Sequence, residues 1–131
     1  MLLLALLLVS PPEAQAAYDK GVALFSQNRA ADAIPYFAEA ARLAPDNAQY
    51  WKALGVAHAK IEDYHGSIEP LRRACELNPA LPDACYYLGR AYYAADFYER
   101  AIEPLRRALR HDPVKGRVEA ALGQCYEALT R

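Results

Sequence analysis

The sequence repeats itself with a fixed period of 34 positions. Residues 67–79 read SIEPLRRACELNP, and residues 101–113 read AIEPLRRALRHDP. The same shift aligns sets of glycines, alanines and prolines: Gly21, Gly55, Gly89 and Gly123; Ala40, Ala74 and Ala108; Pro45, Pro79 and Pro113. A period of this length indicates an array of stacked units, since one unit is too small to bury its apolar face alone.

Each unit reads as two helices joined by a turn. The stripe residues of each half recur at steps of three and four, which is the spacing of one face of an α-helix. In unit two they are Trp51, Leu54, His58 and Ile61, then Ile68, Leu71, Ala74 and Cys75. We expect the second helices to begin at the N-caps Asp63 and Asp96. The repeated prolines close the units, because the residue before a proline is pushed out of the α region.

Two further prolines, Pro70 and Pro104, fall inside the second helices. An interior proline removes one backbone hydrogen bond and costs about 3 kcal/mol. We expect both rings to lie off the apolar stripe, on a face where water reaches the freed carbonyl, with a slight bend in each helix. The alternative is that these helices begin only at Ser67 and Ala101.

This pattern resembles the signature of the tetratricopeptide repeat (TPR) family, W-x2-L-G-x2-Y…A-x3-F…P. Unit two carries it as Trp51, Leu54, Gly55, His58, Ser67, Leu71, Ala74 and Pro79, and unit three as Leu88, Gly89, Tyr92, Ala101, Leu105, Ala108 and Pro113. Unit one is weaker in its first helix, and a fourth unit shows only Leu122, Gly123 and Tyr126. The resemblance covers residues 14–131.

The resemblance implies an all-α fold, a right-handed superhelical stack of helix-turn-helix repeats (an α-solenoid). About three units are expected, 14–47, 48–81 and 82–115, with a capping helix at 116–131. Glycine inside a helix costs about 1 kcal/mol relative to alanine. We therefore expect Gly55, Gly89 and Gly123 to stand where another helix approaches too closely for a side chain. The capping helix is expected to cover unit three through Val118, Leu122, Cys125 and Leu129, and to present a polar outer surface that includes Arg117.

Residues 1–16 have the order of a secretory signal peptide. An eight-residue apolar run from Leu2 to Val9 precedes Ala14-Gln15-Ala16, an A-x-A cleavage pattern. A membrane-spanning helix needs about 20 apolar residues, so we expect no transmembrane helix. The sequence thus predicts a signal peptide at 1–16, a TPR domain at 17–131 and a periplasmic or secreted protein. Because the run lacks a preceding Lys or Arg, two alternatives stay open: a start codon placed too late inside a longer anchor, and an unusual but working signal. If the N-terminus is not a signal, we expect a cytoplasmic protein.

The chain has three cysteines, Cys75, Cys85 and Cys125, with neither a C-x-x-C pair nor zinc-site spacing. Stacking brings the second helix of unit two against the first helix of unit three, so Cys75 and Cys85 are candidates for a disulfide. A bridge requires that their Cα atoms lie within about 7 Å. The alternative is that all three are buried thiols acting as small apolar residues.

Charge and residue spacing argue against several functions. Without residues 1–16 the chain carries 15 basic and 15 acidic side chains, so it lacks the positive field that attracts nucleic acid. The three histidines are scattered, and no nucleophile, carboxylate pair or metal-ligand set forms a pattern. We expect no enzyme activity, no cofactor and no metal. The doublets Arg72-Arg73 and Arg106-Arg107 are interpreted as solvated partners of Glu69 and Glu103 rather than as a headgroup site.

The resemblance also implies a concave groove that holds a peptide or a partner helix. The family's groove positions fall on Tyr18, Val22, Phe25, Lys52, Val56, Lys60, Tyr86, Arg90, Tyr93, Gln124 and Glu127. Aromatic side chains with interspersed charge suit a peptide with apolar anchors. Family members that clamp the C-terminal carboxylates of chaperones use Lys, Asn and Arg there. The matching positions hold Tyr18, Val22, Ala53, Asp83 and Tyr87, so that clamp is not expected.

The sequence therefore predicts a non-enzymatic adaptor or assembly scaffold of the bacterial cell envelope, with a protein or peptide partner. Two alternatives remain: a self-associating structural module whose groove binds its own copies, and a cytosolic regulatory subunit of an enzyme complex. A dimer stable at micromolar concentration would favour the first alternative, and an uncleaved N-terminus is required by the second.

Overall fold

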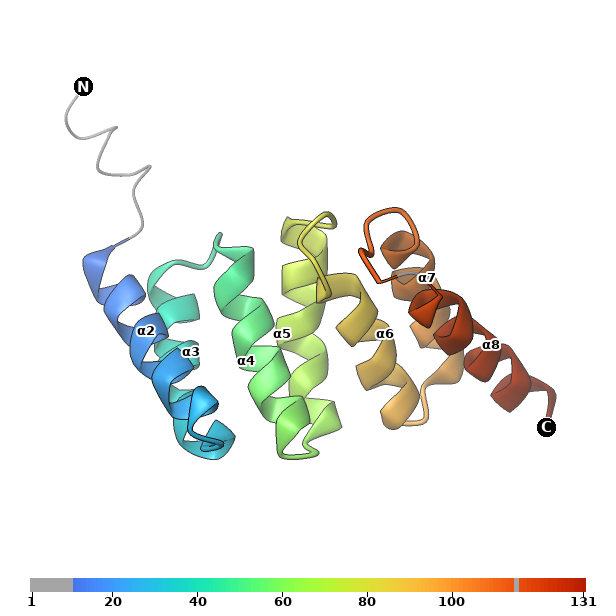
Figure 1. Ribbon diagram of the computed structural model, residues 1–131, viewed down its shortest axis with the longest axis horizontal. Helices are drawn as coiled ribbons and strands as arrows, with labels where there is room; N and C mark the ends of the chain where they lie inside the picture. Colours follow the sequence, from blue (N-terminus) through green and yellow to red (C-terminus); the bar gives the residue numbers. More distant parts are fainter. Residues whose placement is uncertain (1–10, 115) are drawn as a thin grey trace, which may run out of the picture.

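The computed structural model describes residues 11–114 and 116–131, and this part of the chain is helical with no strand. The helices are α2 (Pro12–Ser26), α3 (Ala30–Leu43), α4 (Ala48–Lys60), α5 (Tyr64–Leu77), α6 (Ala84–Ala94), α7 (Tyr98–Ala108) and α8 (Arg117–Thr130). They follow one another in a row from α2 at one end to α8 at the other (Figure 1). The expected pairs are present: α2–α3, α4–α5 and α6–α7, with α8 as a single last helix.

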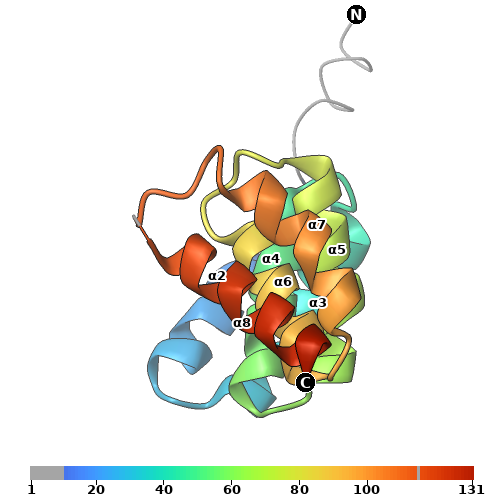
Figure 2. The same cartoon turned by 90° about the vertical axis from the view of Figure 1, so that its right-hand side faces the viewer.

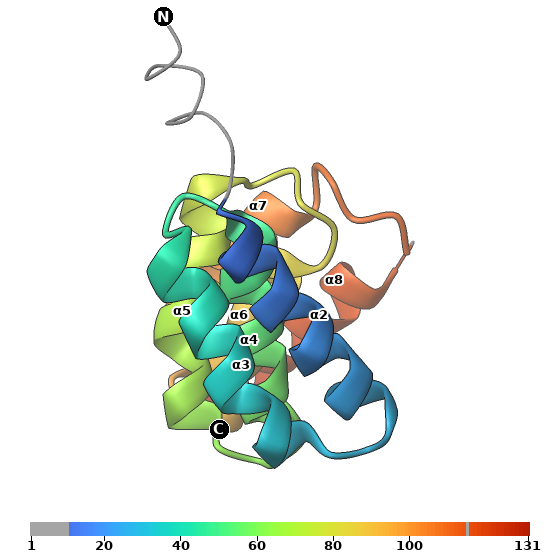
Figure 3. The same cartoon turned by 90° about the vertical axis from the view of Figure 1, so that its left-hand side faces the viewer.

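The helices form two layers. Seen from the α8 end of the row, α2, α4, α6 and α8 lie on one side, and α3, α5 and α7 lie on the other (Figure 2). Seen from the α2 end, α2 lies on the opposite side from α3 and α5 (Figure 3). Each helix packs against its predecessor and its successor in the chain. The first helices of the units thus line one face together, as the resemblance implied.

A large apolar side chain from the second helix of each complete unit packs onto the glycine of the first. A methyl group added at Gly21 would overlap Phe37, one at Gly55 would overlap Leu71, and one at Gly89 would overlap Leu105. Leu71 is 1% exposed and Leu105 is 0% exposed. In each unit the two residues stand 16 positions apart, so the repeat of the sequence is a repeat of one packing contact.

Only one of the two expected N-caps is found. Asp63 caps α5, and its Oδ1 accepts a hydrogen bond of 3.0 Å from the Gly66 backbone N–H. In α7 the cap residue is Phe97, so the prediction for Asp96 is wrong. Asp96 has a φ of 67°, which places it in the turn before the helix, and its Oδ1 accepts a hydrogen bond from the Tyr98 hydroxyl instead.

The prolines inside α5 and α7 are buried, which corrects the expectation that they face water. Both helices also begin before Ser67 and Ala101, so the alternative of a late helix start is wrong as well. The Ser67 N–H donates to the Asp63 carbonyl, and the Ala101 N–H donates to the Phe97 carbonyl. A proline ring presents three methylenes, and their burial in the helix packing offsets part of the lost hydrogen bond.

An ion cluster holds α8 on unit three. Arg117 stacks over the Tyr86 ring at 4.0 Å and donates to Asp112 at 2.7 Å and to Asp83. Asp112 is nearly buried, and its hydrogen bond with Arg117 lowers the pKa of this carboxyl below its ordinary value. The expectation that Arg117 belongs to a polar outer surface is therefore wrong. Leu129 is also exposed rather than packed on unit three, whereas Val118 and Cys125 are buried as expected.

The first helix includes part of the predicted signal segment. Residues 1–10 lie outside the described residues, but α2 begins at Pro12, ahead of the predicted cleavage after Ala16. Ala14 is fully buried, and the Tyr50 hydroxyl donates to the Gln15 side-chain carbonyl at 3.1 Å. Cleavage after Ala16 would therefore remove the first turn of α2 and these contacts.

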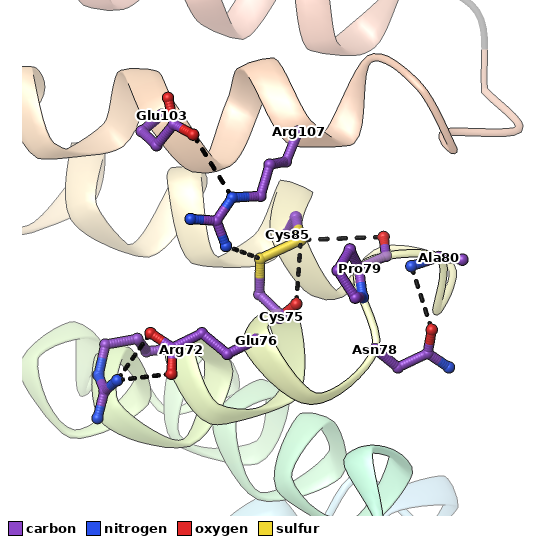
Figure 4. The surroundings of a disulfide bond; sticks show 9 residues. All are labelled: Arg72, Cys75, Glu76, Asn78, Pro79, Ala80, Cys85, Glu103 and Arg107. Carbon is purple, nitrogen blue, oxygen red and sulfur yellow. Dashed lines mark hydrogen bonds and ion pairs between the residues drawn. A yellow bond between two sulfur atoms is a disulfide. The ribbon is translucent and has the colours of Figure 1, made fainter.

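A disulfide joins α5 to α6 across the boundary between units two and three. Cys75 and Cys85 are bonded, and their Cα atoms are 4.8 Å apart. Both residues are buried, and Arg107, paired with Glu103 at 3.5 Å, places a guanidinium nitrogen 3.8 Å from the Cys75 Sγ (Figure 4). Cys125 is a free, buried thiol, and burial raises its pKa.

Candidate functional site

The face formed by the first helices is hollowed in two adjacent places. The first hollow, about 180 Å³ in volume, lies between α2 and α4. It is lined by Tyr18, Val22, Phe25, Phe37, Gln49, Lys52, Ala53 and Val56. Tyr18 forms one wall, and its ring centroid lies 5.8 Å from that of Phe37 and 4.9 Å from that of Tyr50. The Tyr18 ring is thus held by packing and is only partly buried.

The second hollow lies between α4 and α6 and has a volume of about 320 Å³. It is lined by Val56, Ala59, Lys60, Tyr64, Leu71, Tyr87, Arg90, Ala91 and Ala94. Val56 lines both hollows, so they lie next to each other along α4, and the two together are called the groove below. Burial raises the pKa of Tyr87, which keeps its hydroxyl protonated at the inner wall.

The charged side chains of the groove are all basic. Lys52, Lys60 and Arg90 line the two hollows, and no carboxylate lines either of them. The Lys52 ammonium donates to the Pro82 carbonyl at 3.0 Å, and Arg90 donates to the Gln124 side-chain carbonyl at 2.8 Å. Neither bond neutralises a charge, because both acceptors are uncharged. The groove therefore combines apolar floors with net positive charge at its rim.

Seven of the eleven predicted groove residues line the two hollows, and four do not. Those outside are Tyr86, Tyr93, Gln124 and Glu127. Tyr86 lies under the Arg117 guanidinium, Tyr93 packs against Tyr98 at 5.2 Å, and Glu127 pairs with Arg131 at 3.8 Å. Gln124 still borders the groove through its bond to Arg90. Whether the predicted set binds a ligand remains a prediction.

Sequence reasoning missed several groove residues, including those that form its floor. Phe37 and Leu71 belong to the second helices and reach the groove because they fill the space over Gly21 and Gly55. Gln49, Ala53 and Tyr87 lie on the first helices beside predicted positions. The constant spacing between each glycine and its large partner, 16 positions along the chain, was a signal that could have identified the floor.

The described residues offer little for other chemistry. They contain no group of three His, Cys, Asp or Glu side chains placed to hold a metal ion. The arginine doublets are paired as expected: Arg73 lies 3.4 Å from Glu69, and Arg107 lies 3.5 Å from Glu103. None of the helices in residues 11–114 and 116–131 is long and apolar enough to cross a membrane.

The fold and the groove together define a helical-repeat protein whose first helices form a hollowed face. The family profile described as Tetratricopeptide repeat matches residues 2–48, 18–82 and 86–131. The chain belongs to the tetratricopeptide repeat family. No curated protein matches the chain.

Solved structures of TPR domains superpose over most of the chain. The first TPR of Spaghetti (RPAP3) bound to the HSP90 peptide SRMEEVD is 21% identical, with a TM-score of 0.81, covering 94% of this chain and 100% of that one. The Sgt2 TPR domain from Aspergillus fumigatus is 18% identical, with a TM-score of 0.80 and coverage of 93% and 82%. MamA is 26% identical, with a TM-score of 0.82; the match covers 89% of this chain and 64% of MamA. These likenesses establish the fold of about three TPR units.

Proposed function

We propose that this protein is a non-enzymatic interaction module that binds a peptide segment or helix of a partner protein in the groove. The observation that carries the proposal is the pair of adjacent, largely apolar hollows that share Val56 in their lining. Apolar and aromatic pockets with a few placed polar groups suit the anchor residues of a peptide. The RPAP3 structure, which holds an HSP90 peptide, supports peptide binding by this fold.

The partner differs from the chaperone tail of that structure. The family's carboxylate-clamp positions hold Tyr18, Val22, Ala53, Asp83 and Tyr87, and Asp83 is paired with Arg117. We therefore propose an internal segment with apolar anchors rather than a C-terminal carboxylate. Lys52, Lys60 and Arg90 at the rim favour acidic residues between those anchors.

Replacing Val22 with lysine tests the groove. Val22 lines the first hollow, so the variant should bind its ligand more weakly. Because Val22 is 42% exposed, the substitution should not unfold the chain. The probes are peptides selected on the wild-type protein from a displayed random library, then synthesised with a fluorophore. We expect Val22→Lys to weaken their binding by roughly tenfold or more, the value of one buried apolar side chain. Fluorescence anisotropy measures the affinity.

Val114→Lys is the matched control, because Val114 is equally apolar, 50% exposed and outside both hollows. The control should bind like the wild type. Equal binding by Val22→Lys and Val114→Lys would show that the selected peptides use another surface, and the proposed function would be wrong.

We further propose that the protein acts in the bacterial cell envelope after export. The apolar run with its A-x-A pattern supports this, and so does the buried disulfide, since disulfides persist in oxidising compartments such as the periplasm. Intact mass spectrometry of periplasmic and cytosolic fractions tests it. A periplasmic species that starts at Ala17 is expected. Full-length protein found only in the cytosol would contradict export and leave the groove proposal untouched.

A further inference from the structure

The second hollow of the groove crosses a boundary between units that a covalent bond closes. Its floor residue Leu71 belongs to α5 of unit two, and its far wall belongs to α6 of unit three. The disulfide between Cys75 and Cys85 joins the same two helices and holds their Cα atoms 4.8 Å apart. Cys75 lies one turn after Leu71 on α5. Cys85 lies two residues before Tyr87, which lines the hollow from α6.

The first hollow shows how an equivalent boundary is held without a bond. It lies where α2 and α3 of unit one meet α4 of unit two. The positions 34 residues before Cys75 and Cys85 hold Ala41 and Trp51. Both residues belong to one apolar cluster, in which the Trp51 indole is partly buried. Packing therefore holds the boundary under the first hollow, whereas two small side chains and their covalent bond hold the boundary under the second.

Breaking the bond must change the second hollow. Non-bonded heavy atoms keep about 3.5 to 4.0 Å between them, so two thiols cannot stay where the bonded sulfur atoms are. Because Cys75 and Cys85 are both buried, the thiols can separate only if α5 and α6 move apart. Leu71 packs on Gly55 of α4, which keeps α5 in place against α4. The movement is therefore expected at α6, the far wall of the hollow.

We propose that the Cys75–Cys85 disulfide positions the α6 wall of the groove, so that the groove binds its peptide tightly when the bond is formed and weakly when it is reduced. The inference rests on the proposed function, because the ligand is the peptide of the groove. The two cysteines are positioning residues, since neither lines the hollow itself. The redox state should act on the second hollow and leave the first unchanged.

The reductant is a dithiol. One of its thiolates attacks the Cys85 Sγ, which borders a small hollow beside His111, and the sulfur–sulfur bond breaks with Cys75 leaving as a thiolate. The Arg107 guanidinium lies 3.8 Å from the Cys75 Sγ and also contacts Glu103 at 3.5 Å, so it faces the departing negative charge (Figure 4). The second thiolate of the reductant then releases Cys85 from the mixed disulfide. The protein gains two electrons and two protons, and the dithiol becomes a disulfide.

The probes are labelled peptides that occupy both hollows. They are selected on the oxidised protein and lose affinity both in Val22→Lys, in the first hollow, and in Ala94→Trp, in the second. Ala94 lines the second hollow and is exposed, so the larger side chain fills the hollow without disturbing the core. We expect reduction with dithiothreitol to weaken peptide binding by roughly tenfold, the value of one anchor side chain. Fluorescence anisotropy measures the affinity, a thiol count verifies reduction, and circular dichroism verifies that the reduced chain stays helical.

The two groove variants locate the effect. Reduction should change the affinity of Ala94→Trp by less than about twofold, because its second hollow is already filled, and should weaken Val22→Lys by the full tenfold. A merely structural role of the bond would weaken both variants alike. Cys125→Ala keeps the disulfide and should respond to reduction like the wild type. The double variant Cys75→Ala, Cys85→Ala should bind weakly with and without dithiothreitol.

Three results would overturn this inference: equal affinity of the oxidised and reduced protein, an equal response of the two groove variants, and loss of the helical signal on reduction. In the last case the bond would hold the fold rather than the hollow. Peptides that respond to Val22→Lys but never to Ala94→Trp would overturn it as well and leave the proposed function in place. Peptides that ignore Val22→Lys contradict the proposed function itself.

Discussion

Alanine at Gly89 is expected to lower the free energy of unfolding by about 2 kcal/mol, whereas alanine at Gly123 should raise it by up to about 1 kcal/mol. At Gly89 the added methyl group overlaps the fully buried Leu105 side chain and lies 3.3 Å from the Ala101 carbonyl oxygen. Overpacking of this kind costs about 1 to 3 kcal/mol and exceeds the gain in helix propensity. At Gly123 no atom is in the way, so only the gain in propensity remains.

Urea denaturation followed by circular dichroism measures both variants against the wild type. The pair is internally controlled, because the two substitutions are chemically identical and stand at equivalent positions of successive repeats. If both variants were destabilised alike, a helix would have to cover Gly123 in solution. The sequence-based expectation that a helix approaches Gly123, which the structure contradicts, would then hold in solution.

Gly89 and Gly123 also show which features of the fold can be predicted from the sequence. The repeat period predicted the helix pairs, their order and the small positions between them, because all of these depend on contacts that recur in every unit. Gly89 and Gly123 are equivalent in the sequence and differ only in whether a further helix packs on them. The exposure of Gly123 and Leu129 is a property of the end of the stack, which a repeat pattern does not describe.

Predictions from single residues, such as helix caps and interior prolines, were only partly correct, because they also depend on contacts with neighbouring helices. Asp63 directly precedes α5 and caps it, whereas Asp96 stands two residues before Tyr98, the first residue of α7, so Phe97 occupies the cap position there. The burial of Pro70 and Pro104 differs from the expectation, because a proline ring breaks a helix but also offers apolar packing surface. The pattern predicts much of the groove's rim on the first helices, but it does not predict that Tyr86 packs under Arg117, a residue of α8. Pairings at such distance depend on the three-dimensional stack.

Removing the disulfide is expected to have the largest effect on stability. Cys75 and Cys85 close a short loop across the boundary between α5 and α6, with a sequence separation of 10. Loop-closure entropy assigns about 3 kcal/mol to such a cross-link, so the double variant Cys75→Ala, Cys85→Ala should lose about that much free energy of unfolding. The substitutions should weaken the packing of unit two against unit three in particular, because the disulfide joins these two units.

Cys125→Ala is the control, since Cys125 is buried but unbonded, and its loss should cost about 1 kcal/mol. Thiol labelling checks the pairing directly. Burial raises the pKa of Cys125, so the folded chain should react slowly, the unfolded chain should show one thiol, and the reduced unfolded chain should show three. Three reactive thiols without reductant, or equal stability of the double variant and the wild type, would mean that the units are held by packing alone. The stability of this stack would then not depend on an oxidising compartment.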